Sequence, residues 1–469
     1  MLLLLACTST VCGPGTTEKD GVCVADTTGS TPDTTDPTTD PTDDSGTTPT
    51  DDSGPDDTGP SEDATLQVYI LAGQSNMDGY AYQTGLPPAM QVADPRVPLY
   101  WSGWGTFRSL APSSYGGPVF VGPEVSFGRA LADAGEPVVL VKHAVGGTDL
   151  ANYWFPGSTP DAADAGPGFS VLADTMEGAA AELDGQGQPW RWAGFIWMQG
   201  ESDALDATMT AAYEVNLTRL IDAVRTITDE PELPSSIGLI SRESYWTYAD
   251  AVRSAQQAVA DADPFVVTVE TDDLPRNSLD LAHYDGPSNR VLGTRFALSV
   301  LEGVDVPPGV DAPAAALTIS GGSTDYDFTG TCGWEFALPE PILVTDLGAY
   351  GASYLSISVD VGIWDEAGNL VARANVPSWY DAPSNWRSGV WYVAIDPVRL
   401  APGVYRLGMV SWDGDADRYL NDVSGTFAEG IRYTQGVYAQ GYWLTYPAYS
   451  AGSGTVSFVG PDFLFVPTD

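Results

Sequence analysis

The sequence is poor in histidine, in cysteine and in positive charge. Its 469 residues include two His and four Cys, and 19 Lys+Arg stand against 63 Asp+Glu, for a formal net charge of −44. Two histidines cannot build a histidine-rich metal centre, and no Cys/His cluster has zinc-site spacing. Because an acidic surface repels phosphate groups, we expect no nucleic-acid partner and no adsorption to anionic membranes. No apolar run approaches the about 20 residues that a membrane-spanning helix needs.

Large apolar side chains, in contrast, are abundant. Hydrophobic residues make up 43% of the chain, with 14 Trp, 22 Tyr and 14 Phe among them. This composition supplies folded cores and excludes wholesale disorder. At about 100–200 residues per domain, the length predicts two to three domains.

Residues 1–25 indicate export. Leu4-Leu5-Ala6-Cys7 resembles the lipobox of bacterial lipoproteins, in which the cysteine is lipidated. The resemblance implies a lipid anchor at Cys7 on the bacterial cell envelope or surface, or otherwise secretion. A chance match is the alternative, because the basic segment and most of the apolar segment of a signal peptide are missing. Cys12 and Cys23 flank turn-forming residues and would close a small disulfide loop in an oxidising compartment, the alternative being two unpaired thiols.

Residues 26–63 consist almost entirely of Thr, Asp, Pro, Ser and Gly, without Lys or Arg. Such a segment cannot bury apolar surface, and its carboxylates repel one another. We therefore expect an extended, disordered stalk between the start of the chain and its folded part.

Residues 64–305 alternate short apolar runs with helical patterns. We expect strands at 66–72, 137–142, 193–198, 236–240 and 265–269, and helices at 125–134, 170–183, 209–227, 249–262 and 289–301. Continuous apolar runs are typical of parallel strands that are covered on both faces. The alternation predicts an α/β fold, a doubly wound parallel sheet in three layers with right-handed crossovers.

The hydrophobic pattern of the sequence changes after a Pro-rich linker at residues 306–313. Residues 314–469 lack long helical patterns and contain short alternating stretches such as Leu355-Ser356-Ile357-Ser358-Val359, separated by turn signals. They predict an antiparallel β-sandwich accessory domain. This part resembles an uncharacterised module of secreted bacterial enzymes, a resemblance that brings no catalytic residues.

Polar residues follow the expected strands of the α/β body, where open sheets bind ligands. They are Gly73-Gln74-Ser75-Asn76-Met77, Gly146-Gly147-Thr148, Gln199-Gly200-Glu201-Ser202-Asp203 and, near the end of the body, Asp280-Leu281-Ala282-His283. Taken singly, each block is an ordinary helix cap or turn. Together they supply a serine hydroxyl, glycines whose N–H groups can approach a ligand closely, and a base. His283 is the stronger base candidate, because Asp280 lies three residues before it, whereas His143 has no close carboxylate in sequence.

These four blocks, in this order, resemble the SGNH-hydrolase superfamily, and within it the sialate O-acetylesterase-like and acetylxylan-esterase-like carbohydrate esterases. The resemblance covers residues 64–304, about half of the chain. It implies Ser75 as nucleophile, His283 as base and Asp280 as its orienting carboxylate. The implied oxyanion hole combines the N–H of Ser75, an N–H of Gly146 or Gly147 (preferably Gly147) and the Gln199 side chain. Supporting roles fall to Gln74, Asn76 and Glu201.

The implied reaction is removal of O-acetyl groups from a carbohydrate, a polysaccharide or a sialic-acid-type sugar, through an acetyl-enzyme and without a cofactor. One alternative is an inactive, surface-tethered carbohydrate-binding lipoprotein. The intact Ser, Asp and His oppose it. Another is a lipid esterase, which an apolar flap near Ser75 would favour. None is seen there, while Tyr80, Tyr82, Trp101 and Trp104 suit a sugar better. The oligomeric state is left open.

Two features of residues 314–469 suggest ligands. Trp379 and Trp386 lie among loop-forming residues and are candidates for stacking on sugar rings, whereas we assign most other Trp residues of this part to its core. Asp413, Asp415 and Asp417 alternate along a turn and form a weak candidate calcium site, for which a solvated hairpin is the favoured alternative.

Overall fold

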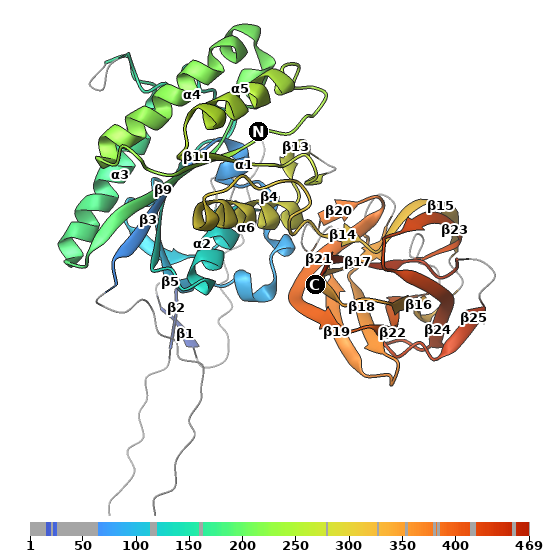
Figure 1. Cartoon of the computed structure of the whole chain (residues 1–469). Coiled ribbons are helices and arrows are strands. Elements are labelled where there is room, and N and C mark those ends of the chain that lie inside the picture. The colour runs from blue at the N-terminus through green and yellow to red at the C-terminus, as the bar shows by residue number, and fades with distance from the viewer. Residues whose placement is uncertain are drawn as a thin grey trace, which may run out of the picture. The chain divides into compact units, whose positions relative to one another are not determined.

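A computed structural model (Figure 1) describes residues 16–19, 22–25, 64–112, 120–158, 163–277, 280–325, 328–351, 355–378, 381, 385–412, 419–452 and 456–468. The chain forms two compact units, Met1–Asp57 and Thr58–Asp469. In the first unit, β1 (Thr16–Lys19) and β2 (Val22–Ala25) pair antiparallel. The predicted lipid anchor at Cys7, the side chains of the predicted disulfide and the predicted stalk lie outside the described residues.

The second unit begins with the predicted α/β fold, which the structure confirms. Seven strands form one sheet in the order β11-β10-β9-β3-β8-β5-β6, in which every neighbouring pair is parallel except β5 and β6. These strands are β3 (Leu66–Gly73), β5 (Asp94–Trp101), β6 (Phe107–Leu110), β8 (Val138–Ala144), β9 (Trp190–Met198), β10 (Ser235–Gly238) and β11 (Val266–Val269).

Helices cover both faces of this sheet (Figure 1). Val68 and Ile70 of β3 share a core with α3, α4 and α5, whereas Tyr69 and Leu71 share the opposite core with α2 and α6. The continuous apolar run of β3 thus arises because its alternate side chains are buried in two different layers. The helices are α2 (Glu124–Asp133), α3 (Pro167–Gln186), α4 (Ala207–Thr228), α5 (Ala249–Ala262) and α6 (Gly286–Glu302). No described helix is long and apolar enough to span a membrane.

The second part of this unit is a β-sandwich, as predicted. One sheet has the order β14-β26-β17-β21-β20 and the other β19-β18-β22-β16-β24-β25, while β15 pairs with β23. Their bounds are β14 Ala314–Ala315, β15 Leu317–Asp325, β16 Gly330–Leu338, β17 Ile342–Tyr350, β18 Val359–Asp365, β19 Leu370–Val376, β20 Asn385–Arg387, β21 Val390–Leu400, β22 Gly403–Ser411, β23 Tyr419–Phe427, β24 Arg432–Gln440, β25 Tyr449–Gly452 and β26 Pro461–Pro467. The core between the sheets includes Trp334, Trp391 and the free thiol of Cys332.

Of the two predicted sugar-stacking residues of the sandwich, the structure describes one, and that one is not displayed as expected. Trp386 lies in β20 and packs against the core, while Trp379 is outside the described residues. Among the other tryptophans, Trp334, Trp364 and Trp391 are buried, as expected for most of them, whereas Trp443 has 80% of its surface exposed. The candidate calcium residues Asp413, Asp415 and Asp417 are also outside the described residues.

Candidate active site

A cavity of about 320 Å³ opens at the carboxyl ends of β3, β8 and β9. It draws residues from all four polar blocks of the α/β body. Its lining consists of Gln74, Ser75, Tyr80, Gly146, Gly147, Glu201, Ser202, Leu205, Tyr245, Trp246, Ala282 and His283. The segments that carry the predicted nucleophile, base and oxyanion-binding glycines therefore meet at one edge of the sheet, as the fold requires.

Ser75 reaches the cavity through a sharp turn at the end of β3. Gly73 has φ +149°, and a Cβ there would lie 2.0 Å from the carbonyl oxygen of Met198 in the neighbouring strand. Only glycine allows this approach. After the turn, the short helix α1 (Ser75–Asp78) begins, with Ser75 at the cavity wall.

His283 lies on β13 (Asp280–Tyr284), which pairs with β12 (Arg276–Asn277). Its Nδ1 is hydrogen-bonded to a carboxylate oxygen of Asp280. The aromatic ring of Tyr80 stacks on the imidazole, with ring centroids 4.5 Å apart and planes within 13°. Because Nδ1 is held by the carboxylate, Nε2 is the nitrogen available to exchange a proton in the cavity.

Asn76 connects the segment of the serine to that of the histidine. Its Nδ2 donates to Glu201 Oε1 at 2.6 Å and to the carbonyl oxygen of Ala282 at 3.3 Å, and its Oδ1 accepts from the N–H of Tyr284 at 3.3 Å. Both neighbours of His283 in the chain are thus bound by one amide. Asn76 thus joins the segments of Ser75 and His283, and we predicted a supporting role for it.

Glu201 is 2% exposed and faces the cavity. Burial raises its pKa, against the lowering effects of the Asn76 hydrogen bond and of the nearby Arg276 and His283. Within the described part of the chain, its Oε2 has no hydrogen-bond partner. Its other oxygen accepts from Asn76.

The glycines after β8 serve two different purposes. A Cβ at Gly146 would lie 3.0 Å from Tyr80 Oη and 3.4 Å from Ser75 Cβ, so glycine lets this backbone lie directly beside the serine. Gly147 has φ +71°, a left-handed conformation, and a Cβ there would meet nothing within 4 Å. Gly146 is therefore needed for space and Gly147 for its backbone conformation.

Gln199 lies behind the cavity wall. It is fully buried, and its Nε2 donates to Asp203 Oδ2 at 2.6 Å, to the carbonyl oxygen of Thr148 at 3.0 Å and to Gln74 Oε1 at 3.3 Å. Both amide hydrogens therefore have protein acceptors, the strongest being a carboxylate. This geometry does not support the predicted donation from Gln199 to an oxyanion.

Gln74 and Asp203 complete the support of the cavity wall. Gln74 Oε1 also accepts from the N–H groups of Gly200 (3.4 Å) and Ser202 (3.2 Å). The carboxylate of Asp203 accepts from the N–H groups of Leu150 (2.8 Å) and Ala151 (3.2 Å), just beyond the glycine loop. Burial raises the pKa of Asp203 to about 6. Asp203 was part of a polar block in the sequence, but nothing in the sequence identified these partners.

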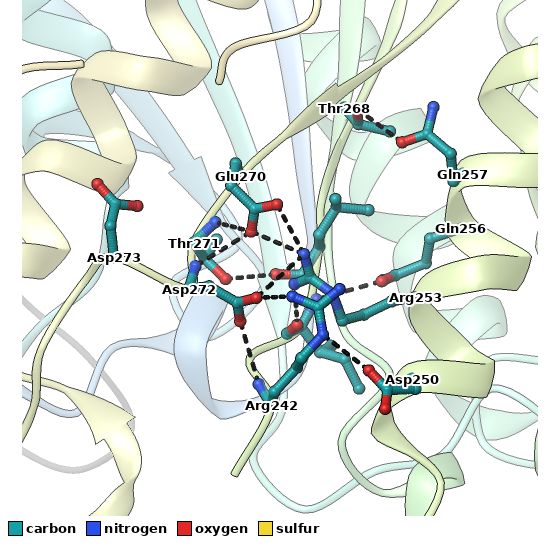
Figure 2. A network of polar contacts seen from close by, with 12 residues as sticks. Arg242, Asp250, Arg253, Gln256, Gln257, Thr268, Glu270, Thr271, Asp272 and Asp273 are labelled. Atoms are coloured by element: carbon teal, nitrogen blue, oxygen red, sulfur yellow. Dashed lines mark hydrogen bonds and ion pairs between the residues drawn. The ribbon is translucent and has the colours of Figure 1, made fainter. Parts of the chain in front are cut away.

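A second polar network joins α5 to the ends of the neighbouring strands. Gln256 Nε2 donates to the carbonyl oxygens of Gln199 (3.1 Å) and Gly238 (3.2 Å), so it joins the residue after β9 to β10. Its Oε1 accepts from the N–H of Ile240 at 3.1 Å (Figure 2). Arg253 binds both carboxylate oxygens of Glu270 at 2.7 Å, next to β11. The Gln256 contact thus holds the start of the loop that carries Glu201.

The other histidine has a structural environment. His143 is buried on β8, its Nδ1 lies 2.8 Å from Ser102 Oγ, and its ring packs on Trp154. Burial lowers its pKa to about 4, so it is neutral near pH 7. It does not line the cavity.

Two further expectations concern the surroundings of the cavity. Of the four aromatic residues expected near a sugar, Tyr80 lines it, whereas Tyr82, Trp101 and Trp104 do not. Among the described side chains, no group of three or more His, Cys, Asp and Glu could hold a metal ion.

The α/β body places this protein among the carbohydrate esterases. Residues 65–302, about half of the chain, match the family described as carbohydrate esterase, sialic acid-specific acetylesterase, and the chain belongs to that family.

The chain is also similar to several solved structures. A protein from Arabidopsis thaliana is 24% identical, with a TM-score of 0.43 over 50% of this chain and 98% of its own. A carbohydrate acetylesterase from Xanthomonas citri is 16% identical, with a TM-score of 0.39 over 78% of this chain and 79% of its own. NanS is 17% identical, with a TM-score of 0.39 over 51% and 97%. No curated protein matches the chain.

Proposed function

We propose that the protein is a serine esterase that removes O-acetyl groups from carbohydrate through Ser75, His283 and Asp280. The observation that carries the proposal is the cavity itself, where Ser75, His283 and the two glycines line one space and Asp280 holds Nδ1 of the histidine. A neutral hydroxyl, an oriented base and free backbone N–H groups are what acyl transfer requires.

In the first half-reaction, Ser75 Oγ attacks the acetyl carbonyl carbon while Nε2 of His283 takes the hydroxyl proton. The carbonyl electron pair moves to oxygen, and the backbone N–H groups of Ser75 and Gly147 stabilise that charge. The bond between the acetyl carbon and the sugar oxygen then breaks, and His283 returns the proton to the sugar. The imidazolium formed meanwhile is stabilised by the Asp280 carboxylate.

In the second half-reaction, water attacks the acetyl-enzyme and His283 accepts its proton. Collapse breaks the bond between Ser75 Oγ and the acetyl carbon, releases acetate and restores the hydroxyl. Gln199 acts only by holding the glycine loop through Thr148 and Asp203. Glu201 acts through Asn76, which keeps His283 beside the serine.

The cavity walls suit a sugar ester better than a long acyl chain. Tyr80, Tyr245 and Trp246 contribute aromatic surface to the lining, and Glu201 and Ser202 contribute polar groups. Aromatic rings offer apolar faces to the C–H groups of a sugar ring, while carboxylate and hydroxyl oxygens can bind its hydroxyl groups.

The test is acetate release from acetylxylan, O-acetylated sialic acid and esters with longer acyl chains, with Ser75→Ala as the matched variant. We expect acetate from at least one acetylated sugar, lost in Ser75→Ala. Binding of the sugars by both proteins without acetate release would instead support an inactive binding protein. Preferential hydrolysis of long-chain esters would indicate a lipid esterase.

A further inference from the structure

The β-sandwich contacts the catalytic segment directly through a buried ion pair. Arg387 of β20 binds Asp285 with two hydrogen bonds, Nε to Oδ2 at 2.5 Å and Nη2 to Oδ1 at 2.8 Å. The side chains of Arg387 and Asp285 are 10% and 1% exposed. A bidentate arginine–carboxylate pair in such a site is strong and geometrically specific. Removing one partner leaves a buried charge without its counterion.

Asp285 lies two residues after His283 and caps helix α6. Its Oδ1 accepts from the N–H of Ser288 at 2.9 Å, and its own N–H donates to the carbonyl oxygen of Pro275 at 3.2 Å. The next N–H, that of Gly286, donates to Asn385 Oδ1 of the sandwich at 2.8 Å. The chain that leaves His283 is therefore fixed at two successive residues by side chains of β20.

A second contact involves the segment that follows Tyr80. Arg290 of α6 donates to the carbonyl oxygen of Gly85 at 2.7 Å and to Asp346 Oδ2 of the sandwich at 2.8 Å. Gly85 ends the short segment that begins at Tyr80, whose ring stacks on His283. The packing here is tight, because a Cβ at Gly85 would lie 2.3 Å from the Cα of Gly286.

We infer that the sandwich completes the esterase site and that Arg387 is a positioning residue for His283, acting through Asp285. This inference rests on the proposed function for its kinetic part only. The sandwich binds the chain that follows the histidine directly, and it binds the segment of Tyr80 through Arg290. Misplacing a catalytic group by about 1 Å can cost about 100-fold in rate.

The kinetic test compares Arg387→Ala and Arg387→Lys with Arg373→Ala, which removes a pair with Asp360 on the sandwich surface, where Arg373 is 57% exposed. We expect kcat to fall about 10- to 100-fold in Arg387→Ala, less in Arg387→Lys, with KM little changed, and no fall in Arg373→Ala. The double variant Asp285→Asn/Arg387→Gln should recover part of kcat, because it removes both charges. Unchanged kcat in folded Arg387→Ala, with only a lower melting temperature, would overturn the inference.

A spectroscopic test does not depend on activity. Because the chain has two histidines, ¹³C-histidine labelling yields two Cε1–H signals, with His143 as an internal reference. We expect Arg387→Ala to shift the His283 signal and to leave that of His143 in place, and Arg373→Ala to shift neither. Equal behaviour of both signals in all variants would overturn the inference. An inactive wild type with the expected shift would refute the proposed function but retain the positioning role.

Discussion

The α/β body and the sandwich each contain a buried carboxyl group with a raised pKa, Glu201 and Asp462, but only Glu201 faces a cavity. Asp462 in the sandwich is 1% exposed, and its two oxygens accept from Tyr392 Oη at 2.6 Å and from the N–H of Leu317 at 3.2 Å. Burial raises its pKa to about 7. Burial also raises the pKa of Glu201, but one oxygen of Glu201 has no partner within the described residues, and its side chain faces the cavity.

The comparison shows that a raised pKa alone does not identify a site. Burial in an apolar environment disfavours the charged carboxylate wherever it occurs. A functional role requires in addition a space for a ligand and polar groups left open toward it. The body meets both conditions at its strand ends, whereas Asp462 has neither, so changes in the two regions should separate activity from stability.

The largest effect is expected at His283, the proposed catalytic base. His283→Ala should lower kcat for p-nitrophenyl acetate by about 10⁴- to 10⁶-fold, because the serine loses its base. The fold should persist, as circular dichroism can show. His143→Ala should lower the melting temperature and change kcat far less, since His143 is a core residue. An equal loss of kcat in the two variants would mean that the wrong histidine has been assigned.

At Asp462 we expect the opposite result: a substitution changes the stability of the fold and leaves the esterase activity unchanged. Its pKa is 3.8 unfolded and about 7 folded, so the folded state holds its proton more tightly. The contribution of this residue to stability is therefore greatest below pH 3.8. It falls by about 1.4 kcal/mol per pH unit up to pH 7 and is constant above that.

Asp462→Asn should remove this slope, and denaturant unfolding of both proteins from pH 4 to pH 8 measures it. The asparagine can keep both hydrogen bonds, accepting from Leu317 and donating to Tyr392 Oη. Parallel stability curves for the two proteins would contradict the assignment. The esterase activity of the folded variant should equal that of the wild type.

A smaller effect on activity is expected at Gly146. Gly146→Ala places a methyl group 3.0 Å from Tyr80 Oη and 3.4 Å from Ser75 Cβ, so the loop or the serine must move. Loss of one oxyanion donor costs about 10²- to 10³-fold in kcat, and we expect a loss near the lower value. Steady-state kinetics measures it, and an unchanged kcat would show that this loop does not bind the oxyanion.

The smallest effect on kcat is expected at Gly147. A matched glycine that does not line the cavity, Gly187, separates the effect of backbone conformation on stability from the effect on catalysis. Gly147 and Gly187 have φ +71° and +74°, and a Cβ at either would meet nothing within 4 Å. Alanine at either position should lower the free energy of unfolding by about 1 kcal/mol. Only Gly147→Ala should also lower kcat. If both variants kept full activity, the N–H of Gly147 would not be a donor to the oxyanion.

Much of the fold and site could be predicted because the signals are local. The run of β3 is apolar throughout, since both faces are buried, and the four polar blocks directly follow or lie near such runs. The strands β5 and β6 were not predicted. Pro95, Arg96 and Pro98 interrupt the apolar pattern of β5. The strand tolerates the prolines because β8 pairs only with residues 99–101 and the pairing with β6 is irregular between Asp94 and Pro98.

Side-chain contacts between residues that are far apart in the sequence could not be predicted. The sequence shows an amide at Gln199 but not that the Asp203 carboxylate and the Thr148 carbonyl take up its hydrogens. Likewise, no sequence pattern near Asp285 predicts its ion pair with Arg387, because Arg387 lies in a distant part of the chain. The lipid anchor and the stalk stay predictions.

The most direct test of the central claim, that Ser75 carries the acetyl group, is covalent labelling by a fluorophosphonate. The serine oxygen would displace fluoride and form a bond to phosphorus. We predict one label per chain, located on Ser75 by peptide mass spectrometry, with esterase activity lost in proportion and no label in His283→Ala. Esterase activity that survives complete labelling of Ser75, or that is lost with the label on another residue, would contradict the account.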